Sequence, residues 1–371
     1  MKKIGILTSS RADFGIYLPL LKEMQRQSWI DARIIVFGTH LSRFHGYTLK
    51  QIEESGFKAS YSVESMLLSD TPDSVSTSIG LTTIQFATFW KEHRADFDLV
   101  FALGDRYEMF AAVMAGVPSQ IKFAHLHGGE KTLGAIDNVF RHCITQASAM
   151  HFTSTQQYAD RVSQMLDEPE HIYWVGALSL DNLSDIKLLN VKEFAEKWQI
   201  DMQEPTVLTT FHPETSNPAR NEHDVLQLVE AIEALNGYRF LVTMPNADTN
   251  GSFVREIFNK RLGQRAGVFL IENLGTQSYF SAMNHCRFLL GNTSSGIIEA
   301  ASFAKYVINL GDRQKGRLCG DNVFTIDVSK DNILAAVKRI ESLPTLSSKN
   351  IYYNGGAAKA IVRTIESIFK E

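Results

Sequence analysis

Cysteine is scarce in this chain of 371 residues. Its three cysteines, Cys143, Cys286 and Cys319, are odd in number and far apart in the sequence. Such spacing fits neither a disulfide framework nor a zinc knuckle, and it suits a reducing compartment. We therefore expect a cytoplasmic protein.

Long apolar runs are missing as well. No stretch approaches the roughly 20 apolar residues of a membrane-spanning helix. The short apolar run near the start is followed at once by Arg11 and Asp13, which excludes the hydrophobic core of a signal peptide. The sequence predicts no membrane partner.

Charge of one sign is not in excess, because 37 basic and 41 acidic side chains give a formal net charge of -4. A basic surface for nucleic acid is therefore not expected. With 44% hydrophobic and 21% charged residues, the composition is that of a globular protein. At about 150 residues per domain, the length indicates two domains.

A glycine-rich dinucleotide fingerprint is also absent after the first apolar run, where the sequence continues Thr8-Ser9-Ser10-Arg11-Ala12-Asp13. Without G-x-G-x-x-G, binding of NAD is disfavoured. We expect no cofactor and no metal.

What the chain does contain is a regular alternation of short apolar runs with helical segments. We predict strands at residues 3–8, 32–36, 99–103 and 121–125 in the first half, and at 206–211, 239–243, 268–271, 288–290 and 307–310 in the second. Alternation of this kind is typical of βαβ units in doubly wound parallel sheets. We place an N-terminal domain at 1–185, a C-terminal domain at 186–355 and a C-terminal helix at 356–371, which is amphipathic with Ala358, Ile361, Ile365 and Ile368 on one face.

In open α/β sheets, ligands bind beyond the carboxyl ends of the strands. After the first strand, Arg11 lies where a helix begins and could fork onto phosphate oxygens. A surface ion pair between Arg11 and Asp13 is the alternative.

Later strand ends in the first half carry carboxylates. Asp105 and Arg106 follow one strand, and Glu130 and Asp137 follow the next. These acids could transfer protons, or could only cap the following helices. Alternation along the strand places His125 and His127 on one face, which leaves a metal site open as another interpretation.

The second half repeats this arrangement with His212 after its first strand and Asn246 after its second. The segment Asn292-Thr293-Ser294-Ser295-Gly296 then leads from a strand into a helix, with Glu299 about one turn later. A helix N-terminus can bind a diphosphate and a carboxylate can hold ribose hydroxyls, although a capped structural helix would look the same. Arg313 stands in a cationic loop that could add to such a site or be solvated.

Taken in order, these motifs resemble the hydrolysing UDP-N-acetylglucosamine 2-epimerases, most closely the bacterial sialic-acid pathway branch. The likeness extends from residue 3 to about residue 325 and rests on the following motifs: Ser10-Arg11-Ala12-Asp13, Gly38-Thr39-His40-Leu41, Gly104-Asp105-Arg106, His127-Gly128-Gly129-Glu130, Ile136-Asp137 with Arg141-His142, His212-Pro213-Glu214-Thr215, Asn292-Thr293-Ser294-Ser295-Gly296 and Gly311-Asp312-Arg313-Gln314. The resemblance implies two facing Rossmann-like domains of the glycosyltransferase-B type with a cleft between them, and a last helix that returns to the first domain.

The resemblance also implies roles for individual residues. Acid/base and catalytic candidates are Asp105, Glu130, Asp137 and His212. Contacts to UDP are expected from Arg11, Arg106, His212, Asn246, Thr293, Ser294, Glu299 and Arg313. The implied reaction turns UDP-N-acetylglucosamine and water into UDP and N-acetylmannosamine through 2-acetamidoglucal, for sialic acid biosynthesis.

Other interpretations remain open. The substrate could instead be the UDP-linked 2,4-diacetamido-2,4,6-trideoxy sugar of the legionaminic acid pathway. The same diphosphate site would serve a retaining glycosyltransferase or a non-catalytic sensor, and His125 with His127 would serve a metal hydrolase. We expect a homo-oligomer, dimeric or tetrameric.

Overall fold

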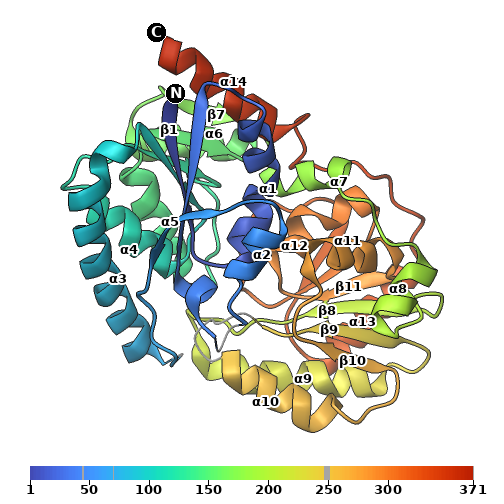
Figure 1. Ribbon diagram of the computed structural model, residues 1–371. Helices are drawn as coiled ribbons and strands as arrows, with labels where there is room; N and C mark the ends of the chain where they lie inside the picture. The colour runs from blue at the N-terminus through green and yellow to red at the C-terminus, as the bar shows by residue number, and fades with distance from the viewer. Residues whose placement is uncertain (44–45, 70, 246–250, 371) are drawn as a thin grey trace. The chain divides into compact units, whose positions relative to one another are not determined.

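The computed structural model describes residues 1–43, 46–69, 71–245 and 251–370, so the predicted contact Asn246 lies outside the described residues. The chain forms two compact α/β units (Figure 1). The first unit comprises Met1–Glu130, Asp137–Asp185 and Tyr352–Glu371, and the second comprises Lys131–Ile136 and Ile186–Ile351. Both units are built on parallel sheets, which confirms the predicted fold class.

The sheet of the first unit has the strand order β3-β2-β1-β4-β5-β6-β7. Its strands are β1 (Lys2–Thr8), β2 (Ile30–Phe37), β3 (Ala59–Val63), β4 (Leu99–Leu103), β5 (Phe123–Leu126), β6 (Met150–Thr153) and β7 (Ile172–Trp174). Every pairing between them is parallel. The order changes direction between β1 and β4, which is where ligands bind in this kind of sheet.

Successive side chains of the central strands enter different cores, as the two-residue period of a strand requires. In β4, Leu99, Phe101 and Leu103 face one core, whereas Val100 and Ala102 face the other. Both sets are almost fully buried, so the strand is apolar along its whole length.

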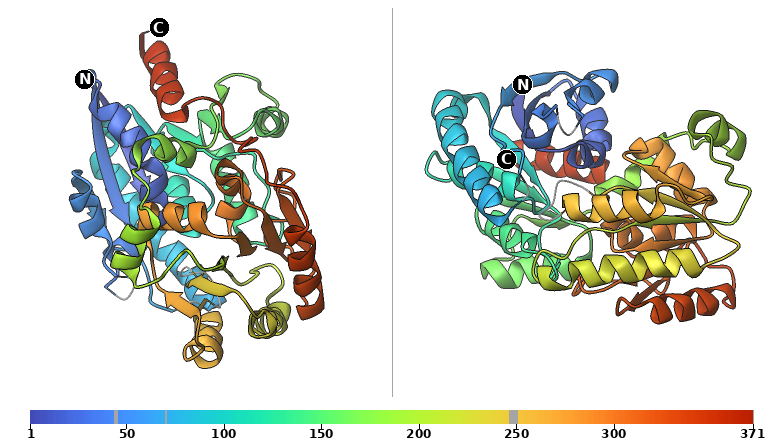
Figure 2. Two further views of the ribbon diagram at one scale, coloured as in Figure 1. Left: turned by 90° about the vertical axis from the view of Figure 1, so that its right-hand side faces the viewer. Right: turned by 90° about the horizontal axis from the view of Figure 1, so that it is seen from below.

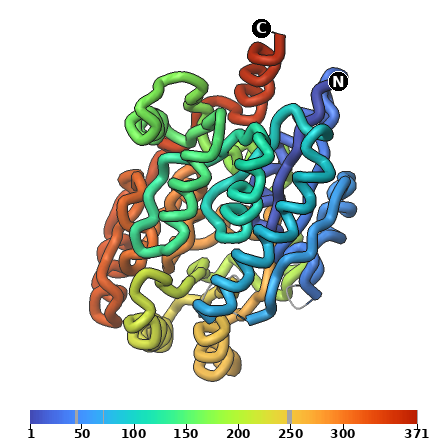
Figure 3. The backbone as a smooth tube through the Cα atoms, turned by 90° about the vertical axis from the view of Figure 1, so that its left-hand side faces the viewer, coloured from blue at the N-terminus to red at the C-terminus, as the bar shows by residue number. Residues whose placement is uncertain are grey.

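Helices cover both faces of this sheet. One core lies under α1 and α14, which pack together; the other lies under α3, α4 and α5, with α3 and α4 side by side (Figure 3). The helices of the first unit are α1 (Arg11–Gln25), α2 (Leu49–Glu54), α3 (Pro72–His93), α4 (Tyr107–Gly116), α5 (Asp137–Gln146), α6 (Gln156–Leu166), α7 (Asn182–Asp185) and α14 (Ala357–Lys370). The buried face of α14 carries Ala358, Ile361 and Ile365.

The sheet of the second unit has the order β10-β9-β8-β11-β12-β13. Its elements are α8 (Val191–Trp198), β8 (Thr206–Thr210), α9 (Asn221–Ala234), β9 (Arg239–Thr243), α10 (Gly251–Leu262), β10 (Val268–Ile271), α11 (Gly275–His285), β11 (Phe288–Gly291), α12 (Ser294–Ile298), β12 (Val307–Leu310), β13 (Val323–Ile326) and α13 (Lys330–Glu341). One core lies under α9, α10 and α13, with α9 packed against the other two (Figure 2). The core of the opposite face lies under α8 and α11.

Two stretches of the chain belong to a different unit from the residues that precede them in the sequence. Residues 131–136 come from the middle of the first unit's sequence but pack with the second. Tyr352 brings the chain back to the first unit, where its carbonyl accepts a hydrogen bond from the backbone N–H of Ala177 at 2.8 Å. Among the described residues, no helix combines the length and apolarity needed to cross a membrane.

Candidate active site

The carboxyl ends of β1, β4, β5 and β6 are neighbours in the first sheet. Arg11, Asp105 and the His127–Glu130 turn follow β1, β4 and β5, and Ser154 follows β6. The parallel sheet therefore brings residues that are far apart in the sequence to one edge.

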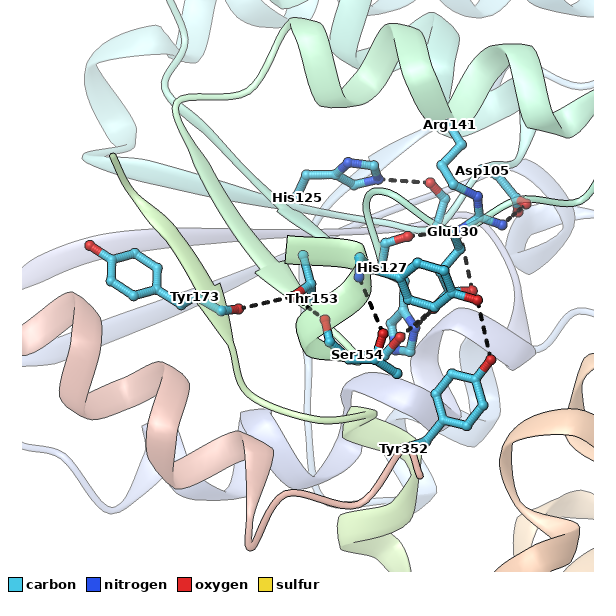
Figure 4. Close-up of polar contacts among 12 residues, drawn as sticks. Asp105, His125, His127, Glu130, Arg141, Thr153, Ser154, Tyr173 and Tyr352 are labelled. Atoms are coloured by element: carbon cyan, nitrogen blue, oxygen red, sulfur yellow. Dashed lines mark hydrogen bonds and ion pairs between the residues drawn. The ribbon is translucent and has the colours of Figure 1, made fainter. Parts of the chain in front are cut away.

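A buried guanidinium links two of these loops. Arg141 of α5, whose side chain is 3% exposed, forms an ion pair with Asp105 (Figure 4). Its Nη1 donates to the backbone carbonyl of His127 at 2.9 Å and lies 3.8 Å from Oε2 of Glu130. The positive charge of Arg141 therefore offsets the negative charges of Asp105 and Glu130, and its hydrogen bond to the His127 carbonyl fixes the turn that leads to Glu130.

The Glu130 carboxylate is fully buried and has close partners. Its Oε1 lies 2.7 Å from Nδ1 of His127 and accepts a hydrogen bond from Oγ of Ser154, also at 2.7 Å (Figure 4). Buried carboxylates require such partners, because an isolated one would lose its hydration without compensation. Asp105, His127, Glu130, Arg141 and Ser154 form one polar network, which we call the carboxylate cluster.

The chain reverses sharply at the start of this cluster. His127 has a φ of +64°, in the left-handed region, and Gly129 has a φ of +79°. A Cβ on Gly129 would lie 2.5 Å from the carbonyl oxygen of Tyr158, so glycine is required there. The turn folds Glu130 back beside His127.

The same turn corrects the expectation that His125 and His127 share a face. Strand β5 ends at Leu126, and the left-handed backbone of His127 interrupts the alternation. The ring of His125 instead contacts Oγ1 of Thr145 at 3.1 Å and the carbonyl of Gly104 at 2.8 Å. Burial lowers the pKa of His125 to about 3, so this imidazole is neutral. Among the described residues, no three His, Cys, Asp or Glu side chains are grouped as metal ligands.

Asp13 caps the N-terminus of helix α1. Asp13 Oδ2 accepts hydrogen bonds from the backbone N–H and Oγ of Ser9 and from the N–H of Ser10, and Oδ1 accepts from Oγ of Ser10. Ser10 and Asp13 form a capping box, so α1 begins at Arg11. Both carboxylate oxygens of Asp13 therefore accept hydrogen bonds from serines. Arg11 is the first residue of the helix, as expected.

Arg106 is the N-cap residue of α4, so Asp105 does not cap that helix. The guanidinium of Arg106 donates through Nε and Nη2 to the two oxygens of Glu108, at 3.2 and 2.9 Å. Glu108 has a side chain that is only 1% exposed, and it fixes the orientation of Arg106. Asp137 is the half-buried first residue of α5.

The second unit brings three of its loops together. Asn292, after β11, donates through Nδ2 to the carbonyl of His212 at 2.8 Å and accepts from the N–H of His212 at 2.7 Å. Gln314, after β12, donates to the carbonyl of Asn292 at 2.8 Å. The loops after β8, β11 and β12 are therefore cross-linked, and we call them the three-loop platform.

Arg313 belongs to this platform. Its Nη1 donates to the carbonyl of Pro213 at 2.6 Å, while the backbone N–H of Asp312 donates to Oε1 of Glu214 at 2.6 Å. Burial raises the pKa of Glu214, and the hydrogen bond from Asp312 opposes that effect. Thr293 and Ser294 lie at the start of α12, with Ser294 its first residue and Glu299 its C-cap. The helix is only five residues long, because the chain turns into a 3-10 segment at Ala300–Phe303.

Residues 131–136 pack on the same platform. The N–H of Leu133 donates to the carbonyl of Lys315 at 3.0 Å, and the N–H of Ile136 donates to Oγ1 of Thr215 at 2.9 Å. Gly134 lies so close to the loop after β12 that a Cβ would stand 2.3 Å from the carbonyl oxygen of Asp312. Only glycine permits this packing.

The sequence matches the UDP-N-acetylglucosamine 2-epimerase family over residues 22–366. A relative from Campylobacter jejuni, described as a GDP/UDP-N,N'-diacetylbacillosamine 2-epimerase (hydrolyzing), is 33% identical over 344 residues, which cover 92% of this chain and 88% of the relative. Polysialic acid biosynthesis protein P7 of Escherichia coli is 31% identical over 375 residues, covering 100% and 95%.

The fold agrees with these matches. The crystal structure of UDP-GlcNAc 2-epimerase from Neisseria meningitidis bound to UDP-GlcNAc is similar with a TM-score of 0.83 and 18% identity, covering 99% of this chain and 100% of that one. Because the family match spans nearly the whole sequence and includes relatives above 30% identity, this chain belongs to the UDP-N-acetylglucosamine 2-epimerase family.

Proposed function

We propose that this protein is a hydrolysing 2-epimerase that converts UDP-N-acetylglucosamine and water into UDP and N-acetylmannosamine. The observation that carries the proposal is the carboxylate cluster, in which Asp105 and Glu130 meet beside a buried guanidinium at the carboxyl edge of the first sheet. Family membership supplies the class of substrate.

Loss of UDP from C1 is the first demand of this reaction. The hydrogen on C2 has no neighbouring carbonyl to acidify it, so its removal requires that the C1–O bond break first or far ahead. Negative charge then grows on the UDP leaving group. Arg313, Ser294 and Arg11 are the groups proposed to stabilise it, and one preorganised donor of this kind typically contributes about 3 kcal/mol.

Proton transfer at C2 is the second demand. Removal of the C2 proton gives 2-acetamidoglucal, and water then adds to C1 while a proton returns to C2 on the opposite face. Groups in distinct environments must hold the proton at different stages. We propose that the carboxylate cluster, which contains Asp105 and Glu130, provides these environments together with Asp137, and that His212 assists from the platform.

A second sugar is supported by a particular relative. The Campylobacter jejuni protein is described as acting on N,N'-diacetylbacillosamine, the 2,4-diacetamido-2,4,6-trideoxy sugar, linked to GDP or UDP. The E. coli relative is described as a polysialic acid biosynthesis protein, which favours N-acetylmannosamine. The two substrates differ at C4 and C6, so the proposed chemistry at C1 and C2 is the same.

One experiment tests the reaction and the choice of sugar together. Purified protein is incubated in D₂O with either UDP-N-acetylglucosamine or the UDP-linked diacetamido sugar, and products are followed by NMR. We expect release of UDP and one deuterium at C2 of the 2-epimerised sugar, with faster turnover of UDP-N-acetylglucosamine. Faster turnover of the diacetamido sugar would assign the chain to that substrate.

Two further outcomes would contradict the proposal. A glycosyltransferase would release UDP only with an added acceptor and would leave C2 unlabelled. A metal hydrolase would lose activity after prolonged treatment with EDTA and regain it with a divalent ion, whereas we expect turnover to be unchanged by the chelator.

A further inference from the structure

His127 has one ring nitrogen bonded and one without a partner. Nδ1 is 2.7 Å from Glu130, whereas Nε2 is buried and has no hydrogen-bond partner among the described residues. The whole residue is 8% exposed. Buried polar atoms are nearly always hydrogen-bonded, so an unpaired one in a cluster of charged groups requires an explanation.

The partner on Nδ1 fixes the chemical state of Nε2. A carboxylate can only accept, so the hydrogen in this contact belongs to Nδ1 of His127. In the neutral imidazole Nε2 then carries a lone pair and is the basic atom. A carboxylate behind one nitrogen also stabilises the imidazolium that forms when the other nitrogen takes a proton.

Glu130 is less suited to take the proton itself. Its Oε1 already receives hydrogen bonds from Ser154 and His127, and Oε2 faces Arg141 at 3.8 Å. Protonating this carboxylate would break or weaken interactions that its negative charge maintains. Its contacts are those of a group that holds a neighbour in place.

The backbone of His127 supports a functional role. A residue other than glycine with a φ of +64° is held against its own preference, and such strain clusters at active sites. His151 provides the contrast: it is also buried and has an unpaired Nδ1, but it lies within β6 in ordinary strand geometry, and no carboxylate of the described part of the chain is paired with it. What distinguishes His127 is therefore the combination of an unpaired nitrogen with a carboxylate partner and a left-handed backbone.

We infer that Nε2 of His127 is the base that removes the C2 proton, and that Glu130 is a positioning residue that orients the imidazole. This inference rests on the proposed function and deepens it. The C2–H electron pair becomes the C1–C2 double bond, the C1–O pair leaves with UDP, and the proton stays on Nε2 as imidazolium. A different group then delivers a proton to the opposite face of C2, and His127 returns its proton to solvent.

Two substitutions of His127 distinguish the roles of its two ring nitrogens. His127→Asn places an amide N–H near the position of Nδ1, tolerates the left-handed backbone, and has no atom at Nε2. His127→Gln reaches toward Nε2 but cannot act as a base. We expect both variants to lower kcat by at least 100-fold, in the range of general-base catalysis, and to change the Kd for UDP by less than threefold.

His151→Asn is the matched control, because it removes another buried imidazole with an unpaired nitrogen. Its turnover per UDP-binding site should stay within threefold of wild type. If His127 only supported Glu130, the Asn variant would keep that support and retain activity within tenfold, which would overturn the inference.

A second measurement tests whether His127 acts in the elimination step and not in the hydration step. Supplied with 2-acetamidoglucal and UDP, His127→Asn should still form the hydrated 2-epimer within tenfold of the wild-type rate, since another group protonates C2. Equal losses in elimination and hydration would overturn the base assignment in favour of a merely structural role. If wild-type protein converts neither UDP sugar, the proposed function fails and this assignment fails with it; an active wild type with an active Asn variant rejects the assignment alone.

Discussion

Three buried imidazoles of the first unit have depressed pKa values. Burial lowers the pKa of His125 to about 3, and that of His40 and of His151 to about 4, from an unfolded value of 6.5. As pH falls below 6.5, the unfolded chain therefore binds protons that the folded chain does not. The stability associated with these neutral rings is present above pH 6.5 and is lost as pH falls toward 4.

This linkage predicts acid sensitivity well above the range in which carboxylates titrate. As pH falls from 6.5 to 5, each ring should reduce the free energy of unfolding with a slope that rises to about 1.4 kcal/mol per pH unit. Urea unfolding at pH 7.5, 6.0 and 5.0 measures the slope. His151→Gln should reduce the slope by about one proton, and an unchanged slope in this variant would contradict the linkage.

At the scale of elements, Gly134 holds residues 131–136 against the loop after β12. In Gly134→Ala, the new Cβ would meet backbone atoms of Asp312 and Arg313 at 2.3 and 2.5 Å, which cannot move like the end of a side chain. We expect a loss of about 1–3 kcal/mol in unfolding free energy, as for other overpacked sites, together with weaker UDP binding. Chemical denaturation and calorimetric titration measure the two effects.

Gly80→Ala is the control for that substitution. Gly80 lies inside α3, where an added Cβ meets nothing within 4 Å. Alanine there should stabilise the protein by about 0.5–1 kcal/mol and leave UDP binding unchanged. If both variants behaved alike, close packing at Gly134 would not be the cause.

Asn292 cross-links the loops of the three-loop platform. Asn292→Ala would remove the two buried hydrogen bonds that Asn292 makes with the N–H and C=O of His212, at a cost of about 1–3 kcal/mol each. We expect at least a tenfold loss in UDP affinity. Asn322→Ala removes a partly buried hydrogen bond to the carbonyl of Lys305 at the opposite, amino-terminal edge of the sheet, so it should lower stability and spare UDP affinity. Equal losses of affinity would contradict the role of the platform.

The elements were largely predictable because the central strands carry an uninterrupted apolar signal. All nine predicted strands and the final helix exist, with ends within about two residues. Strands β3, β6, β7 and β13 were missed. Three of these are edge strands with partly exposed side chains, and β6 is four residues long and contains His151 and Thr153, so hydrophobicity alone does not mark them.

The site was predictable as a set of strand ends but not as a set of contacts. Asp105 and Glu130 could be selected by position, yet Ser154 was missed with its strand, and Arg141 was noted without a role. The pairing of His127 with Glu130 depends on a left-handed backbone that strand periodicity does not anticipate. The predicted catalytic and UDP-binding roles of all the site residues, Asp105 and Glu130 included, remain predictions.

For the whole molecule, UDP should stabilise the fold through the second unit. At 100 times its Kd, a ligand that binds only the folded state adds about 2.7 kcal/mol. We expect a higher Tm with UDP, and hydrogen-exchange protection centred on the loops after β8, β11 and β12. UMP, which lacks the diphosphate, should give a smaller shift; an equal shift would argue against recognition of the diphosphate.

The path of the chain has a consequence for its biosynthesis. Helix α14 covers part of the first core, against α1, but follows every other element of that unit in the sequence. During translation the first unit cannot complete its core until α14 has been made, and α14 follows the entire second unit. The apolar surface that α14 covers therefore stays exposed until then. A ribosome-stalled nascent chain that ends before residue 357 should therefore remain a client of chaperones that bind exposed apolar segments.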